Sequence, residues 1–368
     1  MKKRILVLGA TGSVGHSALT VIEKENYELV GFSYNKNTKL AKKIKNKFPT
    51  SLIFSPSINE INNVNSFDQL LDQSKPDIVL NAIVGFEGLE KTILVIEKQY
   101  DLALANKESL VIAGWLINDL LKQSKSKFFP VDSEHSSLYD ILKNNSKEVK
   151  ELILTCSGGP FFYKQKEELK NASFNDAIKH PNWNMGYKIS VDSATMMNKC
   201  FEIIEAFYLF NTKNIKVVQH KQSIVHSLVK FTDNSYFACM STPDMKLAIQ
   251  QGISGFTSGS QIIQDLNFNN LNLNFNEIDL KTWLPIKWAY DFLKNNKRNI
   301  PIVLNAANDV CIELFKNNKI NFLQINLLIE KTLNHFKKWQ NVKNLDDIKK
   351  LNNQVRVFIN SLKIEKCN

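Results

Sequence analysis

The sequence predicts an α/β fold with a second α/β region after the first sheet and a helical region at the end of the chain. Apolar runs at residues 4–8, 28–37, 77–85 and 101–111 alternate with stretches of helical spacing. This alternation is typical of a parallel sheet whose two faces are covered by helices. A glycine-rich turn joins the first run to a helix. Beyond residue 270 only helical spacing with polar ends remains.

The length and composition indicate a globular protein of more than one domain. The chain has 368 residues, of which 43% are hydrophobic and 23% charged, which is too long for one ordinary core. No apolar run approaches the roughly 18 residues of a membrane span, and the first strand begins at Arg4, so we expect no signal peptide. The five cysteines are scattered without a C-x-x-C pair, which favours a reducing, cytoplasmic location over a disulfide framework or a zinc-thiolate site.

The net charge of +11 does not by itself predict a nucleic-acid partner. Only Arg4, Arg298 and Arg356 are arginines, and the remaining positive charge is lysine in a chain rich in asparagine. Recognition of bases and phosphates usually relies on the arginine fork. We therefore interpret the charge as compositional bias, with some attraction for phosphorylated small molecules, and expect no nucleic acid and no membrane among the partners.

The opening stretch "RILVLGATGSVGHSALTVIEK" predicts a nucleotide-binding strand, turn and helix. Gly9, Gly12 and Gly15 have the spacing that allows a tight turn, close approach to a pyrophosphate and close packing of helix on sheet. A helix starting at Ser13 would offer the free N–H groups of its first turn to a diphosphate. The N-terminal region is therefore expected to be Rossmann-like.

The end of the second predicted strand favours NADPH as the nucleotide. An NAD site places a carboxylate there, on the ribose 2′-hydroxyl, whereas this strand ends in Ser33, Tyr34, Asn35, Lys36 and Asn37. Lys36 can neutralise a 2′-phosphate; the alternative is a solvated lysine in a turn. Further along, the polar run 106–108 (Asn-Lys-Glu) lies at the end of another strand, where ligands of such sheets bind, although by itself this run favours an ordinary helix cap.

The stretch "VDSEH" places two carboxylates, Asp132 and Glu134, directly after an apolar strand. In an extended segment these two side chains project to the same side, and two like charges so placed need a cation or a shared proton. A hard divalent ion prefers oxygen ligands. The alternative is that Asp132 or Ser133 caps the next helix.

A second polar cluster lies in the middle of the chain. "TCSGGPF" puts Ser157 and two glycines after an apolar strand, in the form of an anion-binding nest. "HPNWNMGYKISVDSATMMNKCFEIIEAF" then mixes polar and large apolar groups, and its Glu202 and Glu205 lie about one helical turn apart, so that one faces inward. Serine hydroxyls, an asparagine and a lysine here suit a phosphate.

Taken together, these stretches resemble the 1-deoxy-D-xylulose 5-phosphate reductoisomerase family. "GATGSVG", "ANKES", "VDSEH", "SGGPF", "HPNWNMGYKISVDSATMMNK", "HSLVKF", "TPDM" and "LNAAND" follow the family's order over nearly the whole chain. The resemblance implies NADPH- and metal-dependent rearrangement and reduction of a phosphorylated ketose, 1-deoxy-D-xylulose 5-phosphate, to 2-C-methyl-D-erythritol 4-phosphate in non-mevalonate isoprenoid biosynthesis. It also implies Mg²⁺, Mn²⁺ or Co²⁺ as the cation and a homodimer. We expect an NADPH domain at 1–130, a catalytic domain with a flap and a dimerisation sheet at 131–270, and a helical domain at 271–368.

The resemblance also implies roles for individual residues. The metal ligands would be Asp132, Glu134 and Glu202. Residues around the substrate would be Lys107, Ser133, Ser157, Ser193, Asn198 and Lys199, with Glu134 and Glu202, and the flap would contribute His180, Trp183 and Met185. Residues at the cofactor would be Gly9, Thr11, Gly12, Ser13, Val14, Asn35, Lys36, Asn37, Asn106, Glu108 and Gly186.

Three positions depart from the family's pattern, and one rival activity has a candidate nucleophile. Asn35 and Cys200 stand where glycine is usual, and Tyr187 replaces a basic residue. A semialdehyde dehydrogenase, which also opens on "GATG", would need a nucleophilic cysteine, and Cys156 lies beside the glycine turn. We interpret Cys156 as a small buried residue at a strand end, His220 and His226 as structural, and Met196 and Met197 as packing residues.

Overall fold

The structure is a computed structural model that describes residues 2–58, 60–183, 185–257, 259–338 and 342–362. By its internal contacts the chain divides into two compact units. Unit 1 comprises residues 1–109, 117–148 and 236–271, and unit 2 comprises residues 110–116, 149–235 and 272–368. The three-domain division at residues 130 and 270 stays a prediction.

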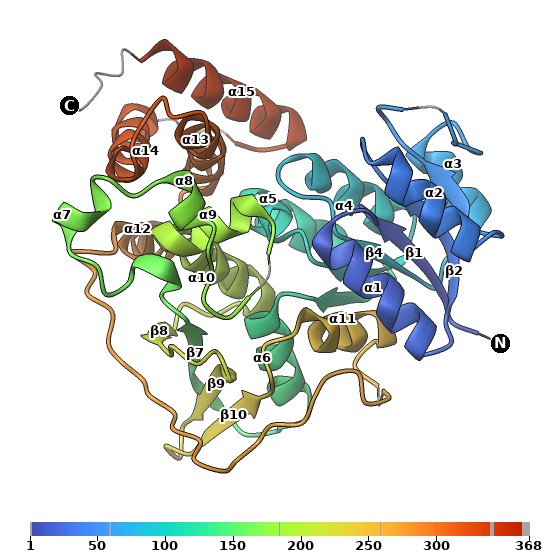
Figure 1. Ribbon diagram of the computed structural model, residues 1–368, viewed down its shortest axis with the longest axis horizontal. Helices are drawn as coiled ribbons and strands as arrows, with labels where there is room; N and C mark the ends of the chain where they lie inside the picture. The colour runs from blue at the N-terminus through green and yellow to red at the C-terminus, as the bar shows by residue number, and fades with distance from the viewer. Residues whose placement is uncertain (1, 59, 184, 258, 339–341, 363–368) are drawn as a thin grey trace. The chain divides into compact units, whose positions relative to one another are not determined.

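Unit 1 is built on a parallel sheet with the strand order β3-β2-β1-β4-β5-β6 (Figure 1). Its strands are β1 (Arg4–Leu8), β2 (Glu28–Ser33), β3 (Leu52–Phe54), β4 (Ile78–Asn81), β5 (Asp101–Leu104) and β6 (Phe128–Pro130). The order reverses between β1 and β4, and ligands of such sheets bind beyond the carboxyl ends of the strands at this point. The predicted Rossmann-like fold is confirmed.

Helices cover both faces of this sheet because the strand side chains alternate. On one face, Ile5 and Val7 belong to a buried cluster with Ala18 and Ile249. On the other face, Leu6 and Leu70 both lie against Gly31. The helices of unit 1 are α1 (Ser13–Lys24), α2 (Thr38–Lys47), α3 (Phe67–Ser74), α4 (Glu87–Glu97), α6 (Ser133–Lys143) and α11 (Met245–Ser254). Strand β10 (Tyr236–Met240) also belongs to unit 1.

The run at 101–111 is only partly a strand, which corrects the sequence-based prediction. Strand β5 ends at Leu104, and α5 (Lys107–Lys122) begins three residues later. The Asn106 side chain accepts a hydrogen bond from the Ser109 N–H at 3.1 Å and so caps α5. The helix is kinked at Ala113, and its residues 110–116 belong to unit 2.

Unit 2 contains a second sheet in which β9, β7 and β8 lie in that order. Strand β7 (Val149–Cys156) pairs parallel with β8 (Ile215–Gln219) and antiparallel with β9 (Val225–Phe231). The 3₁₀ turn η1 (Gly159–Phe161) follows β7. The helices between β7 and β8 are α7 (Lys166–Leu169), α8 (Phe174–Ala177), α9 (Tyr187–Thr195) and α10 (Met197–Phe210).

The predicted helical region near the end of the chain is confirmed. It consists of α12 (Leu284–Asn295), α13 (Asn299–Lys316), α14 (Phe322–Phe336) and α15 (Leu345–Ser361), and α13 packs against both α14 and α15 (Figure 1). Most of α13 is buried, including Asn299, Asn305 and Asn308. Among the described residues, no helix has the length and apolar character needed to cross a membrane.

His220 is a structural residue of unit 2, as predicted. It is completely buried, its Nδ1 lies 2.9 Å from the Asn274 carbonyl oxygen, and its Nε2 accepts the N–H groups of Ile224 at 3.2 Å and Val225 at 3.1 Å. The ring also stacks on Phe275. Burial lowers the pKa of His220, although the bond to the Asn274 carbonyl opposes that shift.

We expect unit 2 to lose stability as pH falls below about 6.5, the pKa of an unfolded histidine, because the unfolded chain then binds a proton that buried His220 resists. The contribution of His220 to the free energy of unfolding is fully present above that pH. It is lost as pH falls, until pH drops below the lower pKa of the folded state. The free energy of unfolding, measured with urea between pH 8 and pH 5, should depend less steeply on pH in His220→Gln than in the wild type. The exposed His16→Gln variant is the control; an equal change of slope in both variants would contradict the assignment.

Candidate active site

The turn after β1 lies where the sequence predicts a nucleotide cradle. Gly9 has φ +82°, its N–H donates to Ser33 Oγ at 3.0 Å, and the Ala10 N–H donates to the Ser33 carbonyl at 2.9 Å. A Cβ on Gly15 would lie 2.3 Å from the Gly9 carbonyl oxygen, so only glycine allows this close packing. Gly12 and Ser13 are exposed at the start of α1, where no side chain caps the helix. The uncapped first turn of α1 suits an anion.

The residues after β2 lie where the second ribose of a dinucleotide would be expected. Asn35, Lys36 and Asn37 are exposed. Asn35 Oδ1 accepts from Ser57 Oγ at 2.6 Å, and Asn37 caps α2 by accepting the Leu40 N–H at 3.1 Å. Lys36 is therefore positioned by two well-held neighbours and is exposed to solvent.

A buried polar network holds the stretch 105–109 at the carboxyl ends of β4 and β5. Asn106 donates from Nδ2 to the Gly85 carbonyl and to Glu108 Oε2, both at 3.0 Å. Asn81 donates to Thr92 Oγ1 at 2.9 Å, and Thr92 Oγ1 donates to Ser109 Oγ at 3.1 Å. The cap interpretation of Asn106 is confirmed, and its role at a ligand stays a prediction. Sequence reasoning missed Asn81 and Thr92; the only signal was a polar residue closing an apolar strand.

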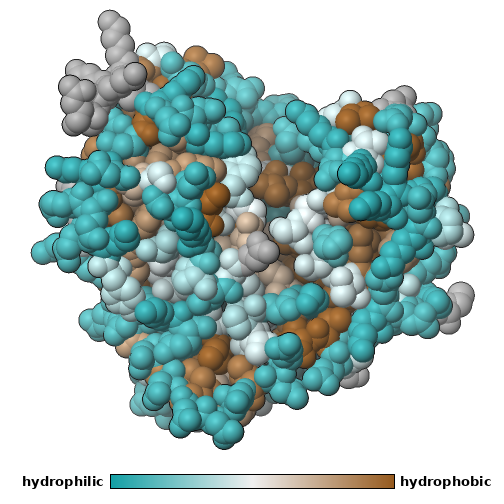
Figure 2. Space-filling view, viewed as in Figure 1, coloured by the Kyte–Doolittle hydropathy of each residue, from teal (hydrophilic) through white to brown (hydrophobic). Residues whose placement is uncertain are grey.

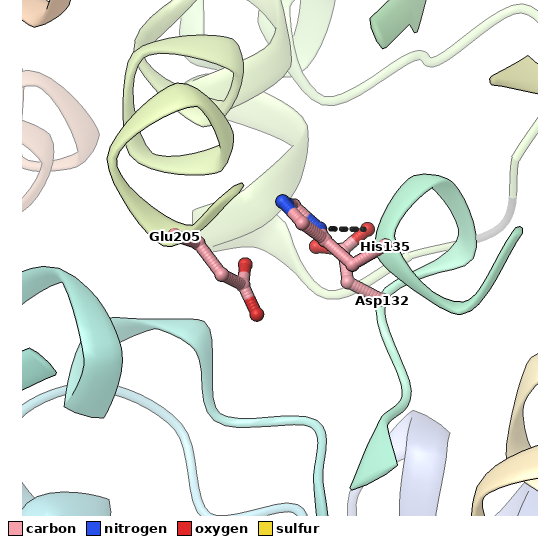
Figure 3. Close-up of side chains that lie close together, drawn as sticks. All are labelled: Asp132, His135 and Glu205. Atoms are coloured by element: carbon pink, nitrogen blue, oxygen red, sulfur yellow. Dashed lines mark ion pairs between the residues drawn. The ribbon is translucent and has the colours of Figure 1, made fainter. Parts of the chain in front are cut away.

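Asp132 lies at the N-cap position of α6, but its side chain makes no capping hydrogen bond. It instead pairs with Lys107, and His135 Nδ1 lies 3.9 Å from Asp132 Oδ1 (Figure 3). Burial alone would raise the pKa of Asp132, but the Lys107 ammonium and His135 outweigh burial and hold this pKa well below its usual range. Asp132 is therefore a carboxylate, the form that a cation needs.

Asp132 and Glu134 lie close together because they are at the start of helix α6, and not because they alternate along a strand. The segment was expected to be extended, yet α6 begins at Ser133, so the alternation argument is wrong. Glu134 lies in the first turn of α6, where the helix dipole favours an acidic side chain. Its Oε2 accepts a hydrogen bond from Ser133 Oγ at 2.5 Å. Both carboxylates are half-buried at one helix N-terminus.

In unit 2, Ser157 and His180 form a hydrogen-bonded pair after β7. His180 Nδ1 accepts the N–H groups of Asn182 at 3.1 Å and Trp183 at 3.0 Å, so the ring proton lies on Nε2. That nitrogen lies 2.9 Å from Ser157 Oγ, which also accepts the Gly159 N–H at 3.1 Å. Ser157 Oγ thus accepts two hydrogen bonds.

Gly158 and Gly159 form a left-handed turn where the sequence predicts an anion-binding nest, and that role stays a prediction. Their φ angles are +89° and +66°, so both lie in the left-handed region where successive N–H groups converge. A Cβ on Gly159 would lie 2.8 Å from the Ser193 carbonyl oxygen. Ser193 of α9 is thereby brought against the nest, and its side chain is half-buried.

Helix α10 carries buried charge beside this nest. Helices α9 and α10 are separated at Met196, which has φ +65°. Lys199 pairs with Glu202 and also donates to the Thr155 carbonyl, and Asn198 donates to Glu202. Glu202 and Glu205 are both buried, so two carboxylates face inward rather than the predicted one. Glu205, drawn in Figure 3, comes from α10.

The remaining residues singled out from the sequence have the environments expected of them. Met196 and Met197 are buried packing residues, and Cys156 is a buried residue at the end of β7. His226 is buried, with its ring 6.2 Å from that of Trp183. Cys200 is buried, which raises the pKa of its thiol. Cys367 lies outside the described residues.

Tyr187 is anchored to a helix of the C-terminal region. Its hydroxyl donates to Glu313 Oε1 at 2.8 Å, and the Lys316 ammonium lies 4.1 Å from the ring centre. Burial and the bond to Glu313 raise the pKa of Tyr187 to about 12. Sequence reasoning also missed Asp192, Asn308 and Asp309, which join the same region; the signal was the unexplained "LNAAND" motif.

Gly159→Ala should lower the free energy of unfolding by about 2 kcal/mol, because alanine is strained at positive φ and its Cβ would press on Ser193. Urea unfolding measures the change. The matched control is Gly186→Ala, since Gly186 has φ −63° and no atom within 4 Å of an added Cβ, so its stability should change by less than about 0.5 kcal/mol. Equal losses in the two variants would show that the nest does not require glycine.

Comparisons with known proteins cover almost the whole chain. Residues 5–114 match the family described as 1-deoxy-D-xylulose 5-phosphate reductoisomerase, and residues 128–210 and 240–358 match two C-terminal domains of that enzyme. A reductoisomerase of Malacoplasma penetrans is 63% identical over 97% of this chain and 95% of its own length. One of Mycoplasmoides gallisepticum is 41% identical over 96% and 95%, respectively.

Solved structures agree with this result. The crystal structure of DOX-P reductoisomerase with NADPH, fosmidomycin and magnesium has a TM-score of 0.89 and 30% identity, covering 98% of both chains. The enzyme from Zymomonas mobilis in complex with NADPH has a TM-score of 0.85 and 31% identity, covering 98% of this chain and all of that one. This chain belongs to the 1-deoxy-D-xylulose 5-phosphate reductoisomerase family.

Proposed function

We propose that this protein converts 1-deoxy-D-xylulose 5-phosphate and NADPH to 2-C-methyl-D-erythritol 4-phosphate, with a divalent cation, in non-mevalonate isoprenoid biosynthesis. The observation that carries the proposal is 63% identity to a reductoisomerase over 97% of the chain. A structural relative binds NADPH, fosmidomycin and magnesium. The reaction is a skeletal rearrangement followed by hydride transfer to the new aldehyde.

In this proposal most of the residues that hold NADPH belong to unit 1, and Gly186 belongs to unit 2. Gly12 and Ser13, both exposed at the start of α1, bind the diphosphate with Thr11 and Val14, and Gly9 makes the turn that lets it approach. Lys36 neutralises the 2′-phosphate, with Asn35 and Asn37 beside it. The remaining cofactor residues are Asn106, Glu108 and Gly186.

We assign the divalent cation to Asp132, Glu134 and Glu202. The donor set fits Mg²⁺, Mn²⁺ or Co²⁺, since all three ligands are carboxylates and Lys107 keeps Asp132 ionised. When bound, the cation polarises substrate oxygens as a Lewis acid and NADPH supplies the hydride. Ser133 and Lys107 then contact the substrate beside Asp132, and Lys199 balances the charge of Glu202.

The substrate phosphate is assigned to unit 2. The hydroxyls of Ser157 and Ser193 and the side chains of Asn198 and Lys199 are the proposed hydrogen-bond donors to it, beside the turn at Gly158 and Gly159. His180, Trp183 and Met185 form a flap that excludes water from the reacting groups when it closes. Phosphate binding at a distance from the reacting carbons supplies the free energy for that closure.

We further propose a cytoplasmic homodimer that acts on this phosphorylated ketose and binds neither nucleic acid nor membrane. Strand β10 carries two exposed aromatic side chains, Tyr236 (53% exposed) and Phe237 (43%), and apolar side chains gather over β10 in Figure 2. An exposed apolar strand of this kind is typical of an interface between copies. Sedimentation at micromolar concentration tests the dimer; a monomer would contradict it.

The decisive experiment measures NADPH oxidation with the phosphorylated ketose, after chelation and after return of Mg²⁺ or Mn²⁺. We expect chelation to abolish turnover and either ion to restore it, because the assigned carboxylates hold the ion that polarises the substrate. The unphosphorylated ketose is the control and should react poorly. Turnover that persists without a divalent ion would refute the metal assignment.

Glu134→Gln should lower kcat by about 100-fold, because glutamine keeps the shape of the side chain and loses the charge that binds the cation. The NADPH dissociation constant, measured by fluorescence, should change by less than about twofold. Glu148→Gln, at an exposed position, should leave both quantities unchanged. Loss of NADPH affinity in Glu134→Gln would instead indicate misfolding.

Lys36→Glu should raise the KM for NADPH by about tenfold and leave the KM for NADH nearly unchanged, because only NADPH carries the 2′-phosphate. The steady-state assay with each cofactor gives both values. Lys43→Glu on α2, also exposed, makes the same change of net charge away from the turn. Equal effects of the two variants would mean that Lys36 acts only through general charge.

A further inference from the structure

Helix α9 joins the flap to the phosphate site, and its own contacts place it on α13. It begins at Tyr187, shortly after the proposed flap residues His180, Trp183 and Met185, and it carries Ser193. Gly186, just before the helix, is exposed, and an added Cβ there would meet no atom within 4 Å. An exposed residue, Gly186, therefore precedes a helix that is held by the contacts described below.

The central tie is buried and polar. Asn308 of α13 is completely buried, and its Nδ2 donates to Asp192 Oδ1 at 2.6 Å. Asp192, also buried, is the residue before Ser193. A buried carboxylate needs hydrogen-bond donors and an opposite charge, so this pairing strongly favours one position of α9.

A chain of ion pairs extends this tie. Lys188 Nζ lies 3.0 Å from Asp192 Oδ2 and 3.5 Å from Asp309 Oδ1. Asp309 Oδ2 in turn accepts a hydrogen bond from Arg356 of α15 at 2.6 Å. The first turns of α9 are thus joined through α13 to α15.

The third tie lies at the first residue of α9. The Tyr187 hydroxyl donates to Glu313 Oε1 at 2.8 Å. Asp309 and Glu313 are four residues apart, so they lie on the same face of α13. That face of α13 therefore contacts the first residues of α9, which directly follow the exposed Gly186.

We propose that Asp192 and Asn308 are positioning residues that, with the Tyr187–Glu313 bond, fix α9 on α13 while the flap moves. They act through Ser193, which the close contact with Gly159 places at the nest. The inference rests on the proposed function, because it concerns the assigned phosphate site. It gives the C-terminal helices a role in binding substrate.

The first test is hydrogen exchange of the peptide that covers residues 187–195, which needs no activity. In Asn308→Ala, exchange of α9 should accelerate by about threefold to tenfold, the effect of losing one hydrogen bond. Asn299→Ala is the matched control, since Asn299 is a buried asparagine of the same helix that donates to the Phe336 carbonyl at 3.1 Å. If α9 exchanges equally fast in both variants, the tie is not specific and the proposal is overturned.

The second test separates positioning from general stability. The KM for the phosphorylated ketose should rise about threefold to tenfold in Asn308→Ala and Asp192→Asn, with the NADPH dissociation constant unchanged. Asn299→Ala should lower the unfolding midpoint without changing that KM. An unchanged KM in variants whose α9 exchanges faster would overturn the link to substrate.

Tyr187→Phe and Glu313→Ala extend the test with exposed side chains, should the buried variants fail to fold. Each should raise the KM for the ketose about twofold to fivefold, and the double variant no more than either alone. Glu313→Gln keeps the acceptor oxygen and should behave as wild type. A wild-type protein without turnover would refute the proposed function, whereas the exchange measurement would still decide whether α13 anchors α9.

Discussion

The buried pair of Lys199 and Glu202 on α10 is the interaction on which the catalytic part of unit 2 depends. Both side chains are almost fully buried, so each charge requires the other together with further hydrogen bonds. Asn198 donates to Glu202, and the Thr155 carbonyl at the end of β7 accepts from Lys199. The pair therefore joins α10 to β7, the strand that leads into the glycine nest. Removing either partner would leave an uncompensated charge in the core.

Unit 1 uses the same principle at the ends of its strands. Lys107 and Asp132 leave β5 and β6 as a buried ion pair, and the hydrogen bonds of Asn81, Thr92 and Asn106 hold the turn that carries Lys107. Apolar strands fill the sheet, and polar groups gather where those strands stop. The result is a set of preorganised charges, so that a cation or a phosphate meets groups that are already oriented.

Much of this organisation could be predicted from local sequence. The run of apolar residues at 4–8, the glycines at 9, 12 and 15, and the helix from Ser13 were all confirmed, because their signals are spacings between residues that are close in the sequence. Two local predictions were wrong in detail. The run at 101–111 ends early because Asn106 caps a helix, and Glu134 lies on a helix rather than an extended segment. In both cases a helix begins earlier than the sequence-based prediction allowed.

The sequence by itself determined the class of fold, the nucleotide cradle, the helical end of the chain and, through its motifs, the family. Those features follow from short-range spacing and turn chemistry. Only the tertiary structure decided which distant residues meet: Asn308 with Asp192, Ser157 with His180, and the Ser193 backbone with Gly159. The physical reason is that a buried polar group chooses its partner by where the whole chain places it, and residues 116 positions apart, such as Asp192 and Asn308, leave no periodic signal.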